Sequence, residues 1–227
     1  MAQLGELLVN ALYLIFLWIL AARMWRAYHE FAPERQRVAR WALLAVIALI
    51  VGDSFHLAPM YYFNPWGGGS GTATAAQWLG LGRLASAFTL SLFYFGLTCY
   101  IYRKFDRAWD GLAWALLATL CVRLALLCFP QNAWFTLETN IWKLYRNLPF
   151  AVQGLGVAGL LWHYARTAPE GQRLQRMTLV IGLSFTFYFA TLIGTQWNPL
   201  WGLAMLPKTI AYMILIAQLY RLEFIPT

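Results

Sequence analysis

Long apolar stretches separated by short polar connections dominate this sequence. A membrane-spanning helix needs about 20 mostly apolar residues. Seven stretches reach or approach that length: 7–28, 41–63, 78–102, 110–129, 147–166, 177–195 and 202–221. The connections are too short to hold a soluble domain. The pattern therefore predicts an all-α protein, with residues 1–227 forming a single transmembrane domain built as a seven-helix bundle.

The composition excludes several other classes of protein. Hydrophobic residues make up 61% of the chain and charged residues 11%, with a formal net charge of +8. An average soluble domain has about 45–50% apolar and about 25% charged residues. An ordinary soluble domain, a disordered chain and a fibrous protein are therefore excluded. In a membrane chain a basic balance reflects cytoplasmic loops, so we expect the lipid bilayer, and no nucleic acid, as a partner.

The positions of Lys and Arg predict the orientation. Of the 17 basic residues, twelve lie in the first, third and fifth connections and the C-terminal tail, two lie in the fourth connection, and three lie inside spans. Loops rich in Lys and Arg stay in the cytoplasm. We therefore expect the N-terminus outside, the C-terminus in the cytoplasm, and a multi-pass membrane protein.

A few ionisable residues lie inside the predicted spans. Mapped through the alternating helix directions, they all fall between the midplane and the outer surface: Asp53, His56, Arg83, Arg123 and Lys208. Arg146 lies just above them, at the mouth of the fifth span. A charge at mid-bilayer costs about 2.5–3.5 kcal/mol and usually faces the interior of the bundle. We therefore expect these side chains to meet in the outer half of the protein.

The signs of these charges do not balance. Three cations face one carboxylate, and even if Glu138 of an outer connection reaches another cation, at least one lacks a protein partner. An unpaired buried charge costs several kcal/mol, whereas Arg and Lys bind carboxylate and phosphate well. The sequence therefore predicts an outward-facing polar pocket that binds, and transports or senses, a small anionic or amphipathic ligand or a lipid headgroup. Its ligand-binding residues would be Asp53, His56, Arg83, Arg123, Arg146 and Lys208. A purely structural network is the alternative.

Two other functions fit parts of the same set. Asp53 and His56 are three residues apart and share a helical face, so they could form an acid–base pair in an enzyme that acts on a lipid phosphate or ester. Ser54, Ser86 or a water would then be the nucleophile. Lys208, in the last span of an N-out seven-helix chain, resembles the retinal-binding lysine of rhodopsins. That resemblance implies a photoreceptor with Asp53 as counter-ion, although Arg83 stands in the span where rhodopsins usually carry an acid.

No other cofactor and no metal is expected. A zinc hydrolase of the seven-helix type needs several histidines at one depth, and only His56 qualifies, because His29 and His163 fall near the cytoplasmic side. The three cysteines all lie in spans. They predict neither an external disulfide nor a metal site.

Four short motifs together resemble a group of small bacterial integral membrane proteins. They are Gly52-Asp53-Ser54-Phe55-His56-Leu57, Pro130-Gln131-Asn132, Arg146-Asn147-Leu148-Pro149-Phe150 and Pro207-Lys208-Thr209. The likeness extends over most of the chain. It implies a seven-helix protein of the bacterial plasma membrane, and it implies no activity.

Overall fold

The computed structural model describes residues 2–63, 73–135 and 141–225, and this part of the chain is mostly helical and contains no strand. Seven helices have 17 residues or more: α1 (Ala2–Glu30), α2 (Pro33–Phe63), α3 (Ala73–Lys104), α4 (Gly111–Leu127), α6 (Leu148–Ala165), α7 (Gly171–Gly194) and α8 (Met205–Glu223). A four-residue helix α5 (Trp142–Tyr145) and two 3₁₀ turns, η1 (Pro130–Asn132) and η2 (Pro199–Ala204), lie in the connections. The predicted all-α class is confirmed.

Five segments are long and apolar enough to cross a membrane: Leu7–Glu30, Pro33–Phe63, Ala73–Lys104, Gly171–Gly194 and Leu200–Glu223. The apolar helix α4 is shorter, with 17 residues, and α6 has 18. These lengths indicate a multi-pass membrane protein. The total of seven spans and the orientation of the termini stay predictions.

Most helices extend beyond the apolar stretches that predict them. α2 begins at Pro33 and not near residue 41, and α7 begins at Gly171 and not near 177. Backbone hydrogen bonding continues where the side chains become polar, and proline at the first helical position favours an early start. α8 begins later than predicted, at Met205, because the preceding residues form η2, whose first turn is capped by the side chain of Asn198.

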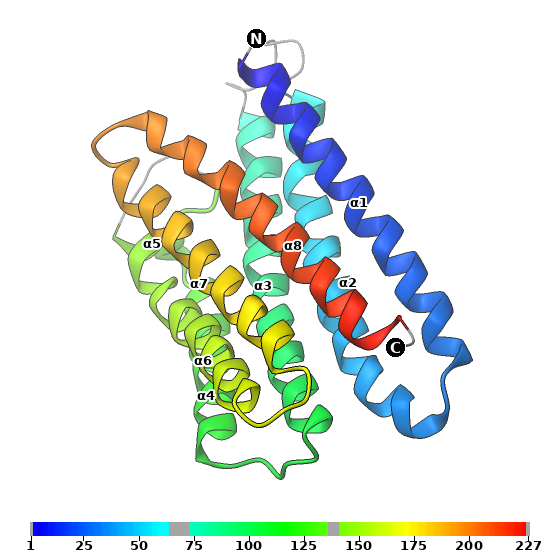
Figure 1. Ribbon diagram of the computed structural model, residues 1–227. Helices are drawn as coiled ribbons and strands as arrows, with labels where there is room; N and C mark the ends of the chain where they lie inside the picture. Colours follow the sequence, from blue (N-terminus) through cyan, green and yellow to red (C-terminus); the bar gives the residue numbers. More distant parts are fainter. Residues whose placement is uncertain (1, 64–72, 136–140, 226–227) are drawn as a thin grey trace.

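The helices form one bundle in which α8 lies between two groups (Figure 1). α8 packs against α1 and α7, while α2 packs against α1 and α3. On the other side α6 contacts α3, α4 and α7. The connections α1–α2, α3–α4 and α6–α7 lie at the lower end in Figure 1, whereas the N-terminus lies at the upper end. Successive long helices therefore alternate in direction.

An ion-pair network, which we call the lower clasp, joins four helices at the lower end. It consists of Arg35, Tyr100, Lys104, Glu170 and Glu223. The Lys104 Nζ lies 2.6 Å from one Glu223 oxygen and 2.9 Å from Glu170. The Tyr100 hydroxyl donates to the same Glu223 oxygen at 2.6 Å, and Arg35 donates to the Glu223 backbone carbonyl at 2.7 Å. The clasp ties the end of α8 to α2, α3 and the start of α7.

Glycines allow α2 and α3 to approach closely. A Cβ added at Gly82 would lie 2.6 Å from the carbonyl oxygen of Phe55 and 3.0 Å from the Cα of His56. A Cβ added at Gly52, on the facing helix, would collide with the side chain of Thr89. Small residues permit such contact between membrane helices. The contact places Asp53 and His56 of α2 directly against α3.

Substitution of Gly82 by alanine tests this contact. Because the obstructing atoms belong to the α2 backbone, the two helices would have to separate. We expect Gly82→Ala to lower the free energy of unfolding by roughly 1–3 kcal/mol, as overpacking generally does. The measurement is the thermal unfolding midpoint in detergent. Gly159→Ala is the matched control, since its added methyl meets nothing within 4 Å, and an equal loss in both variants would contradict the close contact.

Candidate functional site

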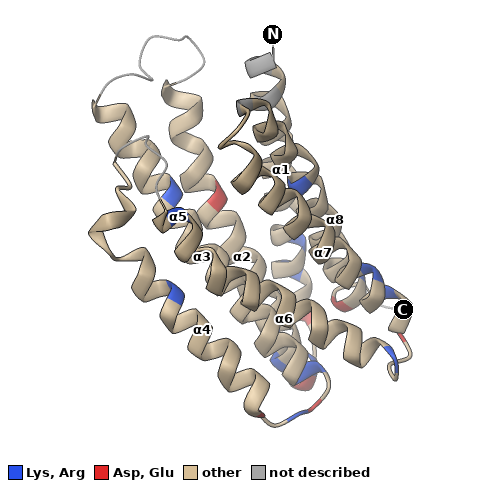
Figure 2. Cartoon of the chain, turned by 90° about the vertical axis from the view of Figure 1, so that its left-hand side faces the viewer, with Lys and Arg blue, Asp and Glu red and all other residues tan. Residues whose placement is uncertain are grey.

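Charged residues occupy two kinds of position in the bundle. Figure 2 shows many of them at the lower ends of the helices and a few isolated ones within the body of several helices. In the described part of the chain both ion pairs involve Lys104 of the lower clasp. The charges within the helix bodies are therefore held by something other than direct ion pairing.

Asp53 is the acid among the charges that lie within the helix bodies near the upper end of the bundle, which we call the upper group. The Tyr13 hydroxyl of α1 donates to its Oδ2 at 2.5 Å, and the Ser86 hydroxyl of α3 donates to its Oδ1 at 3.1 Å. Lys208 of α8 is close enough to attract the carboxylate electrostatically, although no ion pair forms within 4 Å. Asp53 thus joins α1, α2 and α3 through neutral donors, and its charge is only distantly compensated.

Lys208 is half-buried beside two tyrosine rings. Its Nζ lies 4.8 Å from the ring centroid of Tyr188 and 5.6 Å from that of Tyr212. These contacts are cation–π interactions, worth about 0.5–2 kcal/mol. Within the residues that the structure describes, Lys208 makes no hydrogen bond or ion pair. Its ammonium group therefore has no hydrogen-bond acceptor in this part of the chain.

Arg123 is the most deeply buried cation, with 2% of its surface exposed. Its guanidinium lies over the ring of Phe150, 3.8 Å from the centroid. Tyr94, Tyr188 and Tyr212 are its other electrostatic partners, and the hydroxyls of Tyr94 and Tyr212 are hydrogen-bonded to each other at 3.1 Å. Its Nε and Nη1 are buried and have no acceptor among the described residues. Arg123 is thus enclosed by aromatic groups without a counter-ion.

Arg146 lies above Arg123, where α5 leads into α6. Its guanidinium stacks on Trp134 at 4.0 Å, and Nη1 donates to Asn132 Oδ1 at 2.9 Å. Asn132 in turn donates to the Leu126 carbonyl at the end of α4, at 2.6 Å. Burial lowers the pKa of Arg146, and repulsion from Arg83 adds to this effect. The Asn132 contact holds Arg146 in place, and the other N–H donors of its guanidinium have no hydrogen-bond acceptor among the described residues.

Lys143 and Arg83 complete the upper group. Burial, followed by repulsion from Arg146 and Arg83, lowers the pKa of Lys143. Arg83 is exposed, and it also repels charge on His56. Arg83, Lys143 and Arg146 are therefore held close enough to repel one another, and no described acid forms an ion pair with them.

The structure brings all six predicted ligand-binding residues into one electrostatically connected group. Arg123 interacts with Arg146 and Lys208, Arg146 with Arg83, and His56 with Arg83 and Lys208. With Lys143 added, we call this group the cationic cluster: Asp53, His56, Arg83, Arg123, Lys143, Arg146 and Lys208. The members of the cluster lie near one another in the structure, and their role in ligand binding stays a prediction.

The geometry of Asp53 and His56 does not favour an acid–base pair. Both carboxylate oxygens accept hydrogen bonds from other residues, Tyr13 and Ser86. The His56 Nδ1 is buried and has no partner in the described part of the chain. Ser86 therefore bonds to the carboxylate and not to the imidazole, so the hydroxyl–imidazole–carboxylate order that activates a nucleophile is not assembled.

The sequence reasoning missed the neutral groups that hold the cluster. Tyr13 anchors Asp53, Asn132 anchors Arg146, and Phe150 lies under Arg123. The Pro130-Gln131-Asn132 motif is one of the four that resemble small bacterial membrane proteins, but nothing in its spacing predicts the contact with Arg146. Aromatic residues are so frequent in this chain that periodicity does not single out the ones that surround a cation.

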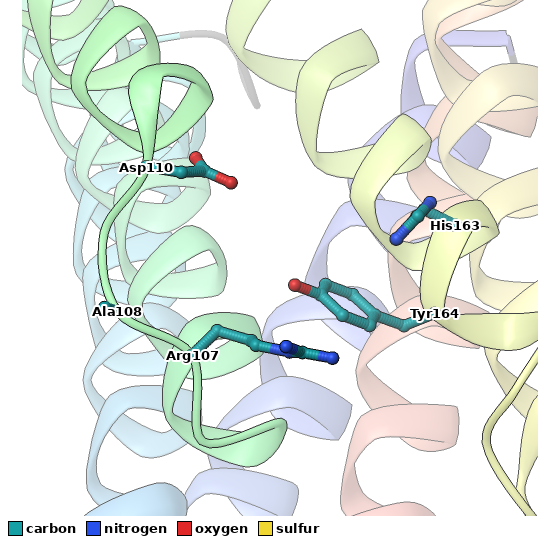
Figure 3. A pocket seen from close by; sticks show the side chains of 5 residues that line it. All are labelled: Arg107, Ala108, Asp110, His163 and Tyr164. Carbon is teal, nitrogen blue, oxygen red and sulfur yellow. The ribbon is translucent and has the colours of Figure 1, made fainter.

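A hollow of about 440 Å³ lies at the lower end, apart from the cationic cluster, and is lined by Arg107, Ala108, Asp110, His163 and Tyr164. In Figure 3 Arg107 and Tyr164 extend toward one another from the α3–α4 connection and from α6. Asp110 caps α4: its Oδ1 accepts from the Tyr102 hydroxyl at 2.5 Å and from two backbone N–H groups of the first turn. The Tyr102 hydrogen bond lowers the pKa of Asp110. The carboxylate in this hollow therefore has a structural role.

Among residues 2–63, 73–135 and 141–225, no three His, Cys, Asp or Glu side chains converge in a way that could hold a metal ion. The cationic cluster is therefore the candidate site, and its chemistry is that of buried and half-buried N–H donors. Comparison of the chain with family models, with curated proteins and with solved structures finds no match.

Proposed function

We propose that this protein is a seven-helix integral membrane protein of the bacterial plasma membrane, and that it binds a small anionic or amphipathic ligand at the cationic cluster from the outer side. The strong bias of Lys and Arg toward one set of connections supports an outside N-terminus and a cytoplasmic C-terminus. The 17 residues of α4 measure about 26 Å at about 1.5 Å per residue, close to the hydrocarbon thickness of about 30 Å. α4 and α6 therefore complete the set of seven spans.

The observation that carries the proposed function is the state of Arg123. A guanidinium that is 2% exposed, with two nitrogens lacking acceptors, would cost several kcal/mol if nothing compensated its charge. Asp53 is not its partner, because that carboxylate is bound by Tyr13 and Ser86. Cation–π contact with Phe150 recovers on the order of 2 kcal/mol and supplies no hydrogen-bond acceptor. An anionic group bound between Arg123, Arg146 and Lys208 supplies the missing acceptors.

The same arrangement favours reception of a ligand over its transport across the membrane. Below the cluster the interior is filled by fully buried apolar and aromatic side chains of α3, among them Phe93, Leu97 and Ile101. Moving a charged ligand past these groups would require desolvation without polar partners. We therefore place sensing ahead of transport. A lipid-directed enzyme and a retinal protein come after both, the first because the Asp53–His56 geometry does not support it.

Binding of amphiphiles of matched length tests the proposal. Protein purified in dodecyl maltoside would be titrated with dodecanoate, dodecyl phosphate, dodecanol and dodecyltrimethylammonium, and thermal unfolding followed by tryptophan fluorescence. We expect the two anions to raise the unfolding midpoint and the neutral and cationic amphiphiles to leave it unchanged, because bound ligand stabilises the folded state.

Arg146→Gln is the matching variant, since Arg146 is half-buried and its loss leaves no buried charge unpaired. It should weaken binding of the anions about tenfold, in line with the loss of a charged hydrogen bond worth about 1.5–3 kcal/mol. Arg107→Gln, at the lower end, is the control and should bind like the parent protein. Equal stabilisation by all four amphiphiles, or equal effects of the two variants, would exclude recognition of anions by the cluster.

A further inference from the structure

We infer that the ligand of the cationic cluster carries at least two negative charges on one headgroup, as a phosphate monoester or a diphosphate does, and is not a simple monocarboxylate. This inference rests on the proposed function and names the class of anion. It follows from the number of charges in the cluster, from the repulsion between its two groups of cations and from the donors that have no acceptor among the described residues.

The first argument is the count of charges. Five cations belong to the cluster, namely Arg83, Arg123, Lys143, Arg146 and Lys208, against the single carboxylate of Asp53. In the whole sequence only Glu6 and Glu138 could add acids to this end of the predicted topology. Even if both reached the cluster, two positive charges would remain without a protein counter-ion. A monoanion would neutralise one of them, and a dianion both.

The second argument is that Arg146 joins two groups of cations. Arg123 and Lys208 form one group, among the rings of Phe150, Tyr188 and Tyr212. Arg83 and Lys143 form the other group, in which Arg83 repels Lys143. Arg146 repels Arg123 of the first group and is repelled by Arg83 of the second, so it connects the two groups electrostatically. A headgroup bound at Arg146 would thus be attracted by cations on both sides. Repulsion of this kind is relieved best by several negative charges in one place.

The third argument concerns the donors. The Arg123 and Arg146 guanidinium groups lie over the rings of Phe150 and Trp134. Among the described residues the Arg123 Nε and Nη1 have no acceptor, and the Arg146 guanidinium donates to Asn132 through Nη1. The Lys208 ammonium adds donors from α8. A planar carboxylate offers two oxygens, whereas a phosphate monoester offers three oxygens in a tetrahedral arrangement and about −1.5 to −2 charge at pH 7. Donors that converge from α4, α5–α6 and α8 match the tetrahedral group better.

This chemistry is shared by two kinds of ligand. A phosphorylated amphiphile of the outer leaflet would place its headgroup in the cluster with its chain among the surrounding apolar side chains. A soluble phosphate ester or diphosphate would enter from the outside. The two sources are distinguished by probes with and without an alkyl chain.

The test compares probes that differ only in charge. Dissociation constants at pH 7.5 and constant ionic strength would be measured by calorimetry in dodecyl maltoside for dodecyl phosphate, for its methyl diester and for dodecanoate. The diester keeps the tetrahedral phosphorus and the chain but has one negative charge. We expect dodecyl phosphate to bind at least tenfold more tightly than either monoanion. Arg146→Gln should reduce this ratio toward one, and Arg107→Gln should leave it unchanged.

Inorganic diphosphate identifies the source. If it displaces dodecyl phosphate at comparable concentration, the ligand is a soluble polyanion, and if it does not, the alkyl chain contributes and the ligand is a lipid; both results support the inference. Equal affinity for dodecyl phosphate, its diester and dodecanoate would overturn the inference while leaving anion recognition intact. Absence of binding by every anion would overturn the proposed function as well.

Discussion

Replacement of Arg123 by methionine is expected to make the ligand-free protein more stable while abolishing binding of anions. The guanidinium is 2% exposed and has no counter-ion in the described chain, so its burial opposes folding. Methionine fills a similar volume and packs well against aromatic rings. Apolar replacement of buried ion pairs is often neutral or stabilising by about 1–4 kcal/mol. An unpaired cation should fall within that range, even after the contact with Phe150 is lost.

The measurement is the free energy of unfolding of Arg123→Met and of the parent protein, each with and without dodecyl phosphate. The variant should unfold at higher temperature in the absence of anion and gain nothing when anion is added. Arg103→Met, at the exposed lower end of α3, is the matched control and should change neither value appreciably. Loss of stability in Arg123→Met without ligand would mean that Arg123 has a structural partner, and a purely structural network would then be the better interpretation.

Removal of the Glu223 side chain is expected to destabilise the protein strongly. Glu223 is 6% exposed, and one of its oxygens accepts from both Tyr100 and Lys104 of the lower clasp. In Glu223→Ala the fully buried Tyr100 hydroxyl loses its acceptor and Lys104 retains only Glu170. Breaking a buried pair costs about 3–5 kcal/mol. Because one partner of Lys104 remains, we expect a loss of about 2–4 kcal/mol in the free energy of unfolding.

The control for this variant is Glu170→Ala. The Glu170 side chain is 26% exposed, and in the described part of the chain its ion pair is with Lys104. Its removal should cost about 1 kcal/mol, the upper end of the range for solvent-exposed pairs. Chemical unfolding in mixed micelles would measure both variants. If the two losses were equal, the shared Glu223 oxygen would not be the centre of the clasp.

The depth of the charged residues could be predicted from the sequence, whereas their surroundings could not. Helices of about 20 apolar residues alternate in direction, so the position of Arg83, Arg123 or Lys208 within its own span fixes its height. Height alone predicts that these residues and Asp53 lie in the outer half of the bundle. The direction in which each side chain points depends on how the helices are rotated about their axes, and that rotation is set by packing, such as the contact of Gly82 with Phe55.

The same limit explains the partners that were not anticipated. Asp53 and His56 share a helical face, which suggested a functional pair, yet α1 and α3 supply Tyr13 and Ser86 and satisfy the carboxylate first. The lower clasp illustrates a second limit. Lys104, Glu170 and Glu223 each look like ordinary charges at a helix end, and only the arrangement of α3, α7 and α8 brings them together.

The position of Arg123 within α4 also bears on how the protein is made. α4 is the shortest of the long helices, and Arg123 is the one ionisable side chain between Gly111 and Leu127 apart from the thiol of Cys121. If α4 is one of the seven proposed spans, this segment enters the bilayer before α6, α7 and α8 have been synthesised. Insertion of an arginine near the centre of a helix is opposed by about 2.5–3.5 kcal/mol, and each Leu favours it by about 0.3–0.6 kcal/mol. The leucines around Arg123 can therefore offset the free-energy cost of inserting its charge into the bilayer during biosynthesis.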